Sequence, residues 1–171
     1  EGFVRSGRWE DHIRDSLREV GVPEMLAALP HVESSFNPEA RSYVGAAGLW
    51  QFTAGTGRRF MRIDSAVDER RDPYRSSEAA ARLLKANYGE LDSWPLAVTA
   101  YNHGTGGMRR AIRATGTDNI ETRVRNYDGP AFGFASRNFY VSFLAAEEVE
   151  RNAEQYFGPI RRDPPEKLTT I

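Results

Sequence analysis

The sequence of 171 residues contains no cysteine, which excludes disulfide bonds, thiolate zinc sites and cysteine nucleophiles. Its three histidines, His12, His31 and His103, match neither H-E-x-x-H nor any other paired-ligand spacing. The H-x-E arrangement of His31 and Glu33 also occurs in zinc deaminases, but the C-x-x-C partner of that motif cannot exist here. We therefore expect no bound metal.

Several other features are missing as well. No apolar run reaches the length of a membrane-spanning helix, and no signal-peptide pattern occurs at the first residues. With 23 Lys and Arg against 24 Asp and Glu, neither sign of charge dominates, so we expect no nucleic-acid partner. A G-x-S-x-G motif is absent, which argues against a serine hydrolase.

The patterns that are present predict a mainly all-α domain. Apolar residues recur every three or four positions, and no sustained alternation indicates a large sheet. Pro30 should kink the second helix or leave an unpaired carbonyl one turn earlier. The charge cluster at 68–73 should be a paired network that fixes a loop. We predict helices after Ser6 up to Gly21, from about 22 to 36, over 53–60, from a Ser77 cap to near Gly89, from a Ser93 cap to Asn102, over 108–115, and through Phe143 to Tyr156.

Glu33 lies at the end of the second predicted helix, just before Asn37. The apolar residues at 25, 26, 29 and 32 predict one buried face for this helix. A carboxylate in the last turn is disfavoured by the helix dipole, and Val32 and Phe36 should keep water away from it. Both effects predict a raised pKa for Glu33, which suits an acid that donates a proton near neutral pH.

A glycine-punctuated segment follows, with polar side chains between the glycines. It carries Ser42, Gln51 and Thr53, and its glycines allow close approach of the backbone to a ligand. A second short motif, Tyr101-Asn102, ends a later helix. These polar residues are the candidate binding residues.

Three motifs in this order carry a specific resemblance: E-S-S-F-N at 33–37, S-Y-V-G-A-A-G-L-W-Q-F at 42–52 and A-Y-N-H-G at 100–104. With L-P-H-V-E-S and V-D-E-R-R-D-P, the chain resembles lytic murein transglycosylases of the goose-type-lysozyme-like superfamily, closest to the membrane-bound D type. The resemblance covers residues 22–157. It implies a lysozyme-like domain over 1–158, with a substrate groove between helices, and a proline-containing tail or linker over 159–171.

The resemblance also implies an activity and a setting. The expected activity is non-hydrolytic cleavage of the β-1,4 bond of peptidoglycan glycan strands, without a cofactor, by a monomer in the periplasm. Because the sequence does not begin with Met, we expect it to start inside a longer precursor that carries an export signal or lipid anchor.

Site roles follow from the resemblance position by position. Glu33 matches the acid that serves as general acid and then as base. Ser42 should contact the acetamido group or orient the acid, and Gln51 should contact a sugar, with Thr53 as a further substrate-binding candidate. Tyr101 should lie close to the acid and Asn102 should help to build the cleft.

Tyr140 matches the tyrosine of a fourth family segment, E-T-x-x-Y-V, and is the remaining substrate-binding candidate. Here that segment reads S-R-N-F-Y-V, so Ser136 and Arg137 depart from the family pattern. The residues after Phe60 depart from it too, so we expect a differently shaped loop there. Aromatic platforms for sugar rings are expected at Tyr127 and Phe132.

Two alternatives remain open. A goose-type hydrolytic lysozyme on the same fold would need a base that activates water, and Asp68 or Asp72 are candidates. A catalytically silent peptidoglycan-binding module would keep the fold without the chemistry. In that case Glu33 would be an ordinary helix-end carboxylate.

Overall fold

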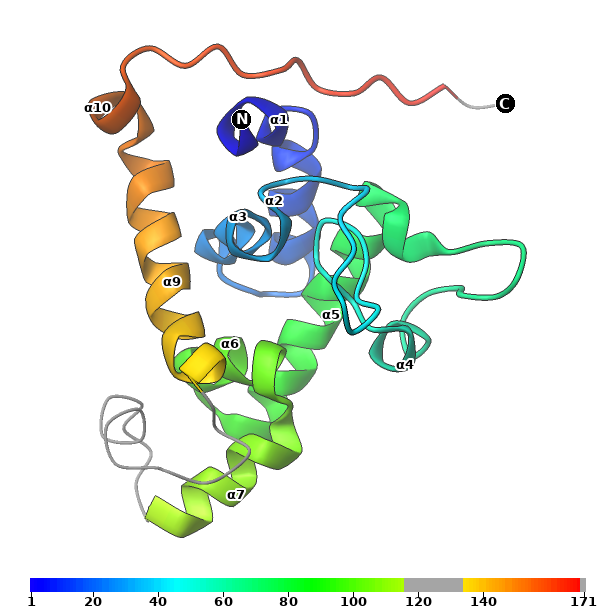
Figure 1. Cartoon of the computed structure of the whole chain (residues 1–171), viewed down its shortest axis with the longest axis vertical. Helices are drawn as coiled ribbons and strands as arrows, with labels where there is room; N and C mark the ends of the chain where they lie inside the picture. Colours follow the sequence, from blue (N-terminus) through cyan, green and yellow to red (C-terminus); the bar gives the residue numbers. More distant parts are fainter. Residues whose placement is uncertain (116–133, 170–171) are drawn as a thin grey trace. The chain divides into compact units, whose positions relative to one another are not determined.

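The structure, a computed structural model, describes residues 1–115 and 134–169, with the side chains of 115 and 134–137 left out (Figure 1). The described part consists of helices and loops and contains no strand, which confirms the predicted all-α class. The chain divides into two compact units, one formed by Glu1–Arg82 with Ala145–Ile171 and the other by Leu83–Leu144. Helices α5 and α9 each contribute residues to both units.

The helices have the following bounds. In the first unit they are α1 (Gly2–Ser6), α2 (Glu10–Glu19), the 3-10 helix η1 (Glu24–Ala28), α3 (Leu29–Ser34), α4 (Ala54–Gly57), the 3-10 helix η2 (Glu69–Arg71) and α10 (Ala153–Phe157). In the second unit they are α6 (Trp94–His103) and α7 (Thr105–Thr115). The two that span both are α5 (Pro73–Leu91) and α9 (Phe134–Arg151).

The core of the first unit forms around α2. Trp9, Ile13 and Leu17 of the predicted first helix are buried, and α2 contacts η1, which leads into α3 (Figure 1). The prediction that this helix packs on the segment carrying Glu33 is therefore confirmed. The core is completed by Leu26, Leu29, Phe36, Leu49 and Trp50.

The prediction of one continuous helix from about 22 to 36 is wrong. The segment starts as η1 after Pro23 and continues as α3, with Pro30 in the first turn of α3. The backbone N–H groups of a helix's first turn have no partner within the helix, so a proline is tolerated there. In place of the predicted kink, the chain changes from a 3-10 helix to an α-helix just before Pro30. Met25 is 44% exposed, against the prediction that it lies on the buried face, because three residues per turn rotate it away from Leu29.

The start of α5 also differs from the prediction of a Ser77 cap. The helix begins five residues earlier, at Pro73, and the Asp72 carboxylate accepts hydrogen bonds from the backbone N–H groups of Tyr74 (2.8 Å) and Arg75 (3.1 Å). Ser77 is buried inside the helix, where its hydroxyl accepts a hydrogen bond from the Trp50 indole at 2.9 Å. Asp followed by Pro is itself a strong helix start, which the prediction overlooked.

The second unit contains a small core between α6 and α7. Leu96, Ala100 and Met108 are buried there, with Leu91 and Ile112 packed against them. The Ser93 cap is confirmed, because its hydroxyl accepts a hydrogen bond from the backbone N–H of Leu96 at 3.4 Å. Helix α7 begins at Thr105, three residues before the predicted start, and the arginines at 109, 110 and 113 are exposed as expected.

The tail after Gly158 is extended, as predicted, but it is not a free linker. It passes over α1 and the start of α2 (Figure 1), where Arg8 pairs with Asp163 at 2.8 Å and the Trp9 indole donates to Glu166 at 2.8 Å. Gly7 allows this approach, since a Cβ there would lie 2.2 Å from the carbonyl oxygen of Asp163. We call residues 162–166 the C-terminal strap. Its other contacts join Arg162 to Ser6 and Glu10, and its backbone N–H groups to the carbonyls of Val4 and Arg8.

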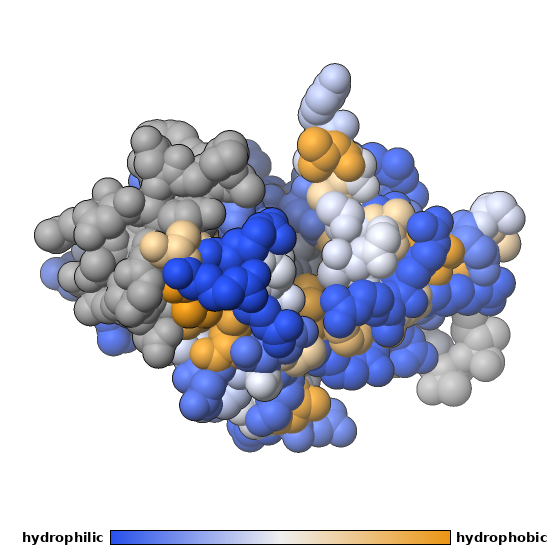
Figure 2. Space-filling model, turned by 90° about the horizontal axis from the view of Figure 1, so that it is seen from below, coloured by the Kyte–Doolittle hydropathy of each residue, from blue (hydrophilic) through white to orange (hydrophobic). Residues whose placement is uncertain are grey.

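The described surface is mixed in polarity. Figure 2 shows hydrophobic residues on one face as separate small groups between hydrophilic ones. Among the helices of the described part, none combines the length and apolarity needed to cross a bilayer.

Candidate active site

Glu33 lies in the last turn of α3, as predicted. The helix ends there because Ser35 and Phe36 both take left-handed backbone angles, with φ of 51° and 55°. Phe36 turns back into the core and is fully buried. The carboxyl of Glu33 is therefore held at a sharp turn between a short helix and a buried aromatic ring, where it is itself half-buried.

Burial raises the pKa of Glu33 to about 8. No described residue offsets this effect with a hydrogen bond or an opposite charge. The raised pKa predicted from the sequence is thus confirmed in direction, and its cause is the removal of water. At neutral pH the side chain holds its proton, as a general acid must before it reacts.

Helix α3 is anchored on its other side by His31. The imidazole lies 3.5 Å from the Glu150 carboxylate, and both side chains are about 8% exposed. Burial alone would raise the pKa of Glu150, but its contact with His31 and the charge of Arg14 outweigh burial and lower it. The His31 ring also contacts Phe3 and Phe36 at centroid distances of 4.4 and 4.5 Å. These contacts fix the helix from which Glu33 projects.

The segment carrying Ser42 folds into a tight turn. The backbone N–H of Ser42 donates to the Ala46 carbonyl (2.9 Å), and its hydroxyl accepts from the Ala46 N–H (3.0 Å). Short antiparallel bridges at Arg41–Ala47 and Ala47–Phe52 extend this arrangement. Ser42 is exposed, and its hydroxyl acts as the acceptor in the bond to Ala46.

The turn segment is tied directly to the end of α3. The hydroxyl of Ser34, the neighbour of Glu33, donates to the carbonyl of Leu49 at 2.8 Å. Leu49 itself is fully buried. One hydrogen bond to a buried backbone group thus couples the helix that carries the acid to the segment that carries Ser42 and Gln51.

Arg70 stabilises this turn through hydrogen bonds to its backbone, a role that the sequence did not reveal. It is 8% exposed, forms a two-pronged ion pair with Asp68 (2.7 and 2.8 Å), and donates to the carbonyls of Gly45 (2.9 Å) and Phe52 (3.2 Å). The predicted charge network at 68–73 is confirmed. Its partners on the turn could not be predicted, because they lie 18 and 25 residues away in the sequence.

The side chains of Gln51 and Thr53 both have local structural roles. The Gln51 amide nitrogen donates to the carbonyls of Ala40 (3.1 Å) and Gly48 (2.9 Å), and its own φ of 49° is left-handed. The Thr53 hydroxyl caps the short helix α4. Their predicted contacts with a sugar stay predictions. In Gln51 both hydrogen bonds use the side-chain nitrogen, so a contact with a sugar would use the side-chain oxygen.

The other predicted binding residues belong to the second unit. Tyr101 and Asn102 lie in the last turn of α6, and Tyr140 lies in α9, where burial raises its pKa. Their predicted roles beside the acid stay predictions. Tyr127 and Phe132, the expected aromatic platforms, lie outside the described residues.

The acidic residues considered as a second catalytic carboxylate are engaged elsewhere. Asp68 pairs with Arg70, whose hydrogen bonds lower the pKa of Asp68, and the Asp72 carboxylate caps α5. Two further acids, Glu39 and Asp64, pair with Arg71 and Arg62. In the described part of the chain, no acid contributes to the pKa of Glu33.

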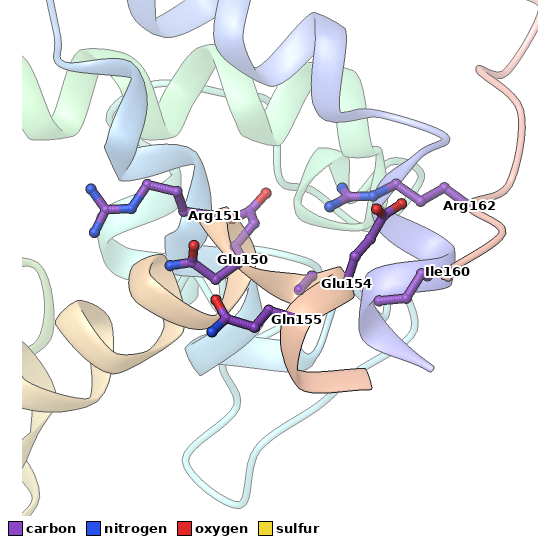
Figure 3. Close-up of a pocket in the computed structure, with 8 residues that line it drawn as sticks. Glu150, Arg151, Glu154, Gln155, Ile160 and Arg162 are labelled. Atoms are coloured by element: carbon purple, nitrogen blue, oxygen red, sulfur yellow. The ribbon is translucent and has the colours of Figure 1, made fainter. Parts of the chain in front are cut away.

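Two hollows in the first unit have none of the predicted site residues in their linings. One, of about 420 Å³, lies beside the junction of α9 and α10, and Figure 3 shows Glu150, Glu154 and Arg162 around it. The other, of about 550 Å³, is mainly apolar and is lined by residues such as Phe3, His31 and Phe157. No group of three or more His, Asp or Glu among the described residues is placed to hold a metal ion.

Comparison with known proteins gives consistent results. Residues 13–124 match the family described as Transglycosylase SLT domain. The membrane-bound lytic murein transglycosylase D of Escherichia coli (strain K12) is 30% identical over 146 residues, which cover 84% of this chain and 32% of that protein. The chain thus spans about a third of the length of this relative.

Two solved structures resemble the chain in fold. An inactive mutant of the lytic transglycosylase Slt from Pseudomonas aeruginosa has a TM-score of 0.69 at 20% identity, covering 90% of this chain and 25% of that one. The 70 kDa soluble lytic transglycosylase of Escherichia coli has a TM-score of 0.71 at 20% identity, covering 85% and 24%. At this identity the likeness concerns the fold, which is the predicted lysozyme-like one.

Proposed function

Because the chain belongs to the transglycosylase SLT domain family, we propose that it cleaves the β-1,4 bond between N-acetylmuramic acid and N-acetylglucosamine in bacterial peptidoglycan. Glu33 serves as the general acid and then as the base. The proposal includes a location in the periplasm, where this substrate lies. No cofactor takes part.

The observation that carries this proposal is the state of the Glu33 carboxyl. Burial raises its pKa to about 8, and the charge of no described acidic residue contributes to that shift. Glycoside hydrolysis normally uses two carboxylates, one as acid and one as base or nucleophile. A single protonated carboxyl suits a reaction in which the substrate supplies its own nucleophile.

The mechanism needs two proton transfers and no water. Protonated Glu33 donates its proton to the glycosidic oxygen, and the bond between that oxygen and C1 of the muramoyl residue breaks. The 6-hydroxyl of the same muramoyl ring then attacks C1, while the Glu33 carboxylate removes the hydroxyl proton. The products are a free 4-hydroxyl on N-acetylglucosamine and a 1,6-anhydro-N-acetylmuramoyl end, and Glu33 regains its proton.

Mass analysis of digested peptidoglycan tests this function. We expect the chain to release fragments whose muramoyl ends are lighter by one water than reducing ends, and the Glu33→Gln variant to release none. Fragments with only reducing ends would identify a hydrolytic lysozyme instead. A chain that binds peptidoglycan without releasing fragments would be a silent binding module.

The rate of cleavage should depend on pH through Glu33. Because the reaction starts from the protonated carboxyl, kcat/KM should be level below pH 8 and fall about tenfold per pH unit above it. Initial rates of clearing of a peptidoglycan suspension between pH 5 and 10 measure this profile, with circular dichroism at each pH as the control for folding. A decline centred near the ordinary value of 4.5 would contradict the assignment of Glu33 as the acid.

A further inference from the structure

Among the large hydrophobic side chains of the described residues, Tyr43 has the highest exposed fraction, 105%, and its neighbour Val44 is 77% exposed. Both stand at the tip of the Ser42–Ala46 turn, and we call them the Tyr43–Val44 tip. An aromatic ring and a branched aliphatic side chain that are both left in water offer apolar area to a binding partner.

The exposure of this tip does not come from a loosely held loop. Gly45 N–H donates to the Ser42 carbonyl (3.0 Å), and both polar groups of Ser42 bond to Ala46. The Arg70 guanidinium donates a hydrogen bond to the Gly45 carbonyl (2.9 Å). The backbone on either side of Tyr43 is therefore fixed, so only the side chain of Tyr43, and not its backbone, has to be ordered when a ligand binds.

The tip belongs to the same braced segment as the candidate active site. Tyr43 directly follows Ser42, and the segment is joined to the end of α3 by the hydrogen bond from Ser34 to Leu49. A glycan strand bound at Ser42 therefore lies next to the tip.

The size and charge of the tip fit a sugar ring better than a membrane or a protein. An aromatic residue buries about 150–250 Å², whereas each partner in a stable protein interface buries about 800 Å². Membrane-surface contacts combine apolar residues with unpaired basic ones. The basic residue nearest in sequence is the single Arg41, whose charge helps to lower the pKa of the Asp68 carboxylate. A neutral pyranose face is the ligand that matches.

We propose that the Tyr43–Val44 tip is a substrate-binding element that contacts the face of a peptidoglycan sugar ring. This inference rests on the proposed function and assigns part of its substrate recognition. The tip adds affinity for the strand and takes no part in proton transfer.

Kinetics with soluble strands of alternating N-acetylglucosamine and N-acetylmuramic acid test the inference. Tyr43→Ala should raise KM about three- to tenfold, the value of one aromatic contact, while kcat stays within about twofold. Tyr43→Phe should keep the KM of the unmodified chain, because it keeps the ring. Tyr156→Ala is the matched control, since Tyr156 is 56% exposed on α10. Thermal unfolding should not change in any of the three variants.

The outcomes separate this inference from the proposed function. An unchanged KM for Tyr43→Ala in a chain that cleaves would overturn the inference and leave the function standing. If the chain does not cleave, binding to pelleted peptidoglycan is measured instead, with Glu33→Gln and with Glu33→Gln/Tyr43→Ala. Weaker binding of the double variant supports the inference, and equal binding overturns it. Loss of binding to phosphatidylglycerol vesicles in Tyr43→Ala, with unchanged glycan binding, would identify a membrane contact instead.

Discussion

Glu33→Gln is expected to stabilise the fold at pH 7 by about 3 kcal/mol. In the unfolded chain the carboxyl titrates near 4.5, and in the folded protein burial raises its pKa to about 8. Between these values the folded protein holds a proton that the unfolded chain has lost, so its stability falls as the pH rises. Glutamine has no proton to lose and escapes this penalty.

Urea unfolding at pH 4, 7 and 9 measures the effect. The advantage of Glu33→Gln should be smallest at pH 4, grow by about 1.4 kcal/mol per pH unit above 4.5, and level off above pH 8. Glu19→Gln, at an exposed position on α2, controls for the loss of a surface charge. A difference between Glu33→Gln and the unmodified chain that is the same at all three pH values would contradict the raised pKa.

Gly48→Ala is expected to lower the free energy of unfolding by about 4 kcal/mol. Gly48 has a left-handed backbone with φ of 82°, which costs any other L-residue energy. In addition, a Cβ at this position would lie 1.8 Å from the carbonyl oxygen of Arg70. The oxygen belongs to the backbone of a buried residue, so the 3-10 helix η2, which carries Arg70, would have to move.

Gly45→Ala is the matched control for this prediction. Gly45 has almost the same φ, 81°, but a Cβ added there would meet no atom within 4 Å. Gly45→Ala should therefore lower the free energy of unfolding only by the cost of the left-handed backbone, about 1–2 kcal/mol. Chemical denaturation of both variants measures the difference between them. Equal losses would show that the clash between a Cβ at position 48 and the Arg70 carbonyl oxygen adds nothing to the destabilisation.

The helical architecture was largely predictable because local patterns determine it. The spacing of Trp9, Ile13 and Leu17 predicted the buried face of α2, and Ser93 predicted the start of α6. The change from η1 to α3 was not predictable, because a 3-10 turn and an α turn differ little in apolar spacing over five residues. Packing around Leu26 and Leu29 decides between them.

The candidate site was predictable only where chemistry is local. The position of Glu33 at a helix end and the direction of its pKa shift follow from neighbouring residues. The size of the shift depends on the lack of a charged partner among the described residues, which only the folded chain reveals. The support of the Ser42 turn by Arg70 joins residues far apart in sequence, and no periodicity indicates it.

The C-terminal strap has a consequence for how the chain folds during synthesis. The indole of Trp9 and the guanidinium of Arg8 find partners in Glu166 and Asp163, which follow them by more than 150 residues. These contacts have to wait until the ribosome has translated and released the last part of the domain. Helix α1 and the first turn of α2 therefore complete their native contacts late, although they are made before the other described helices.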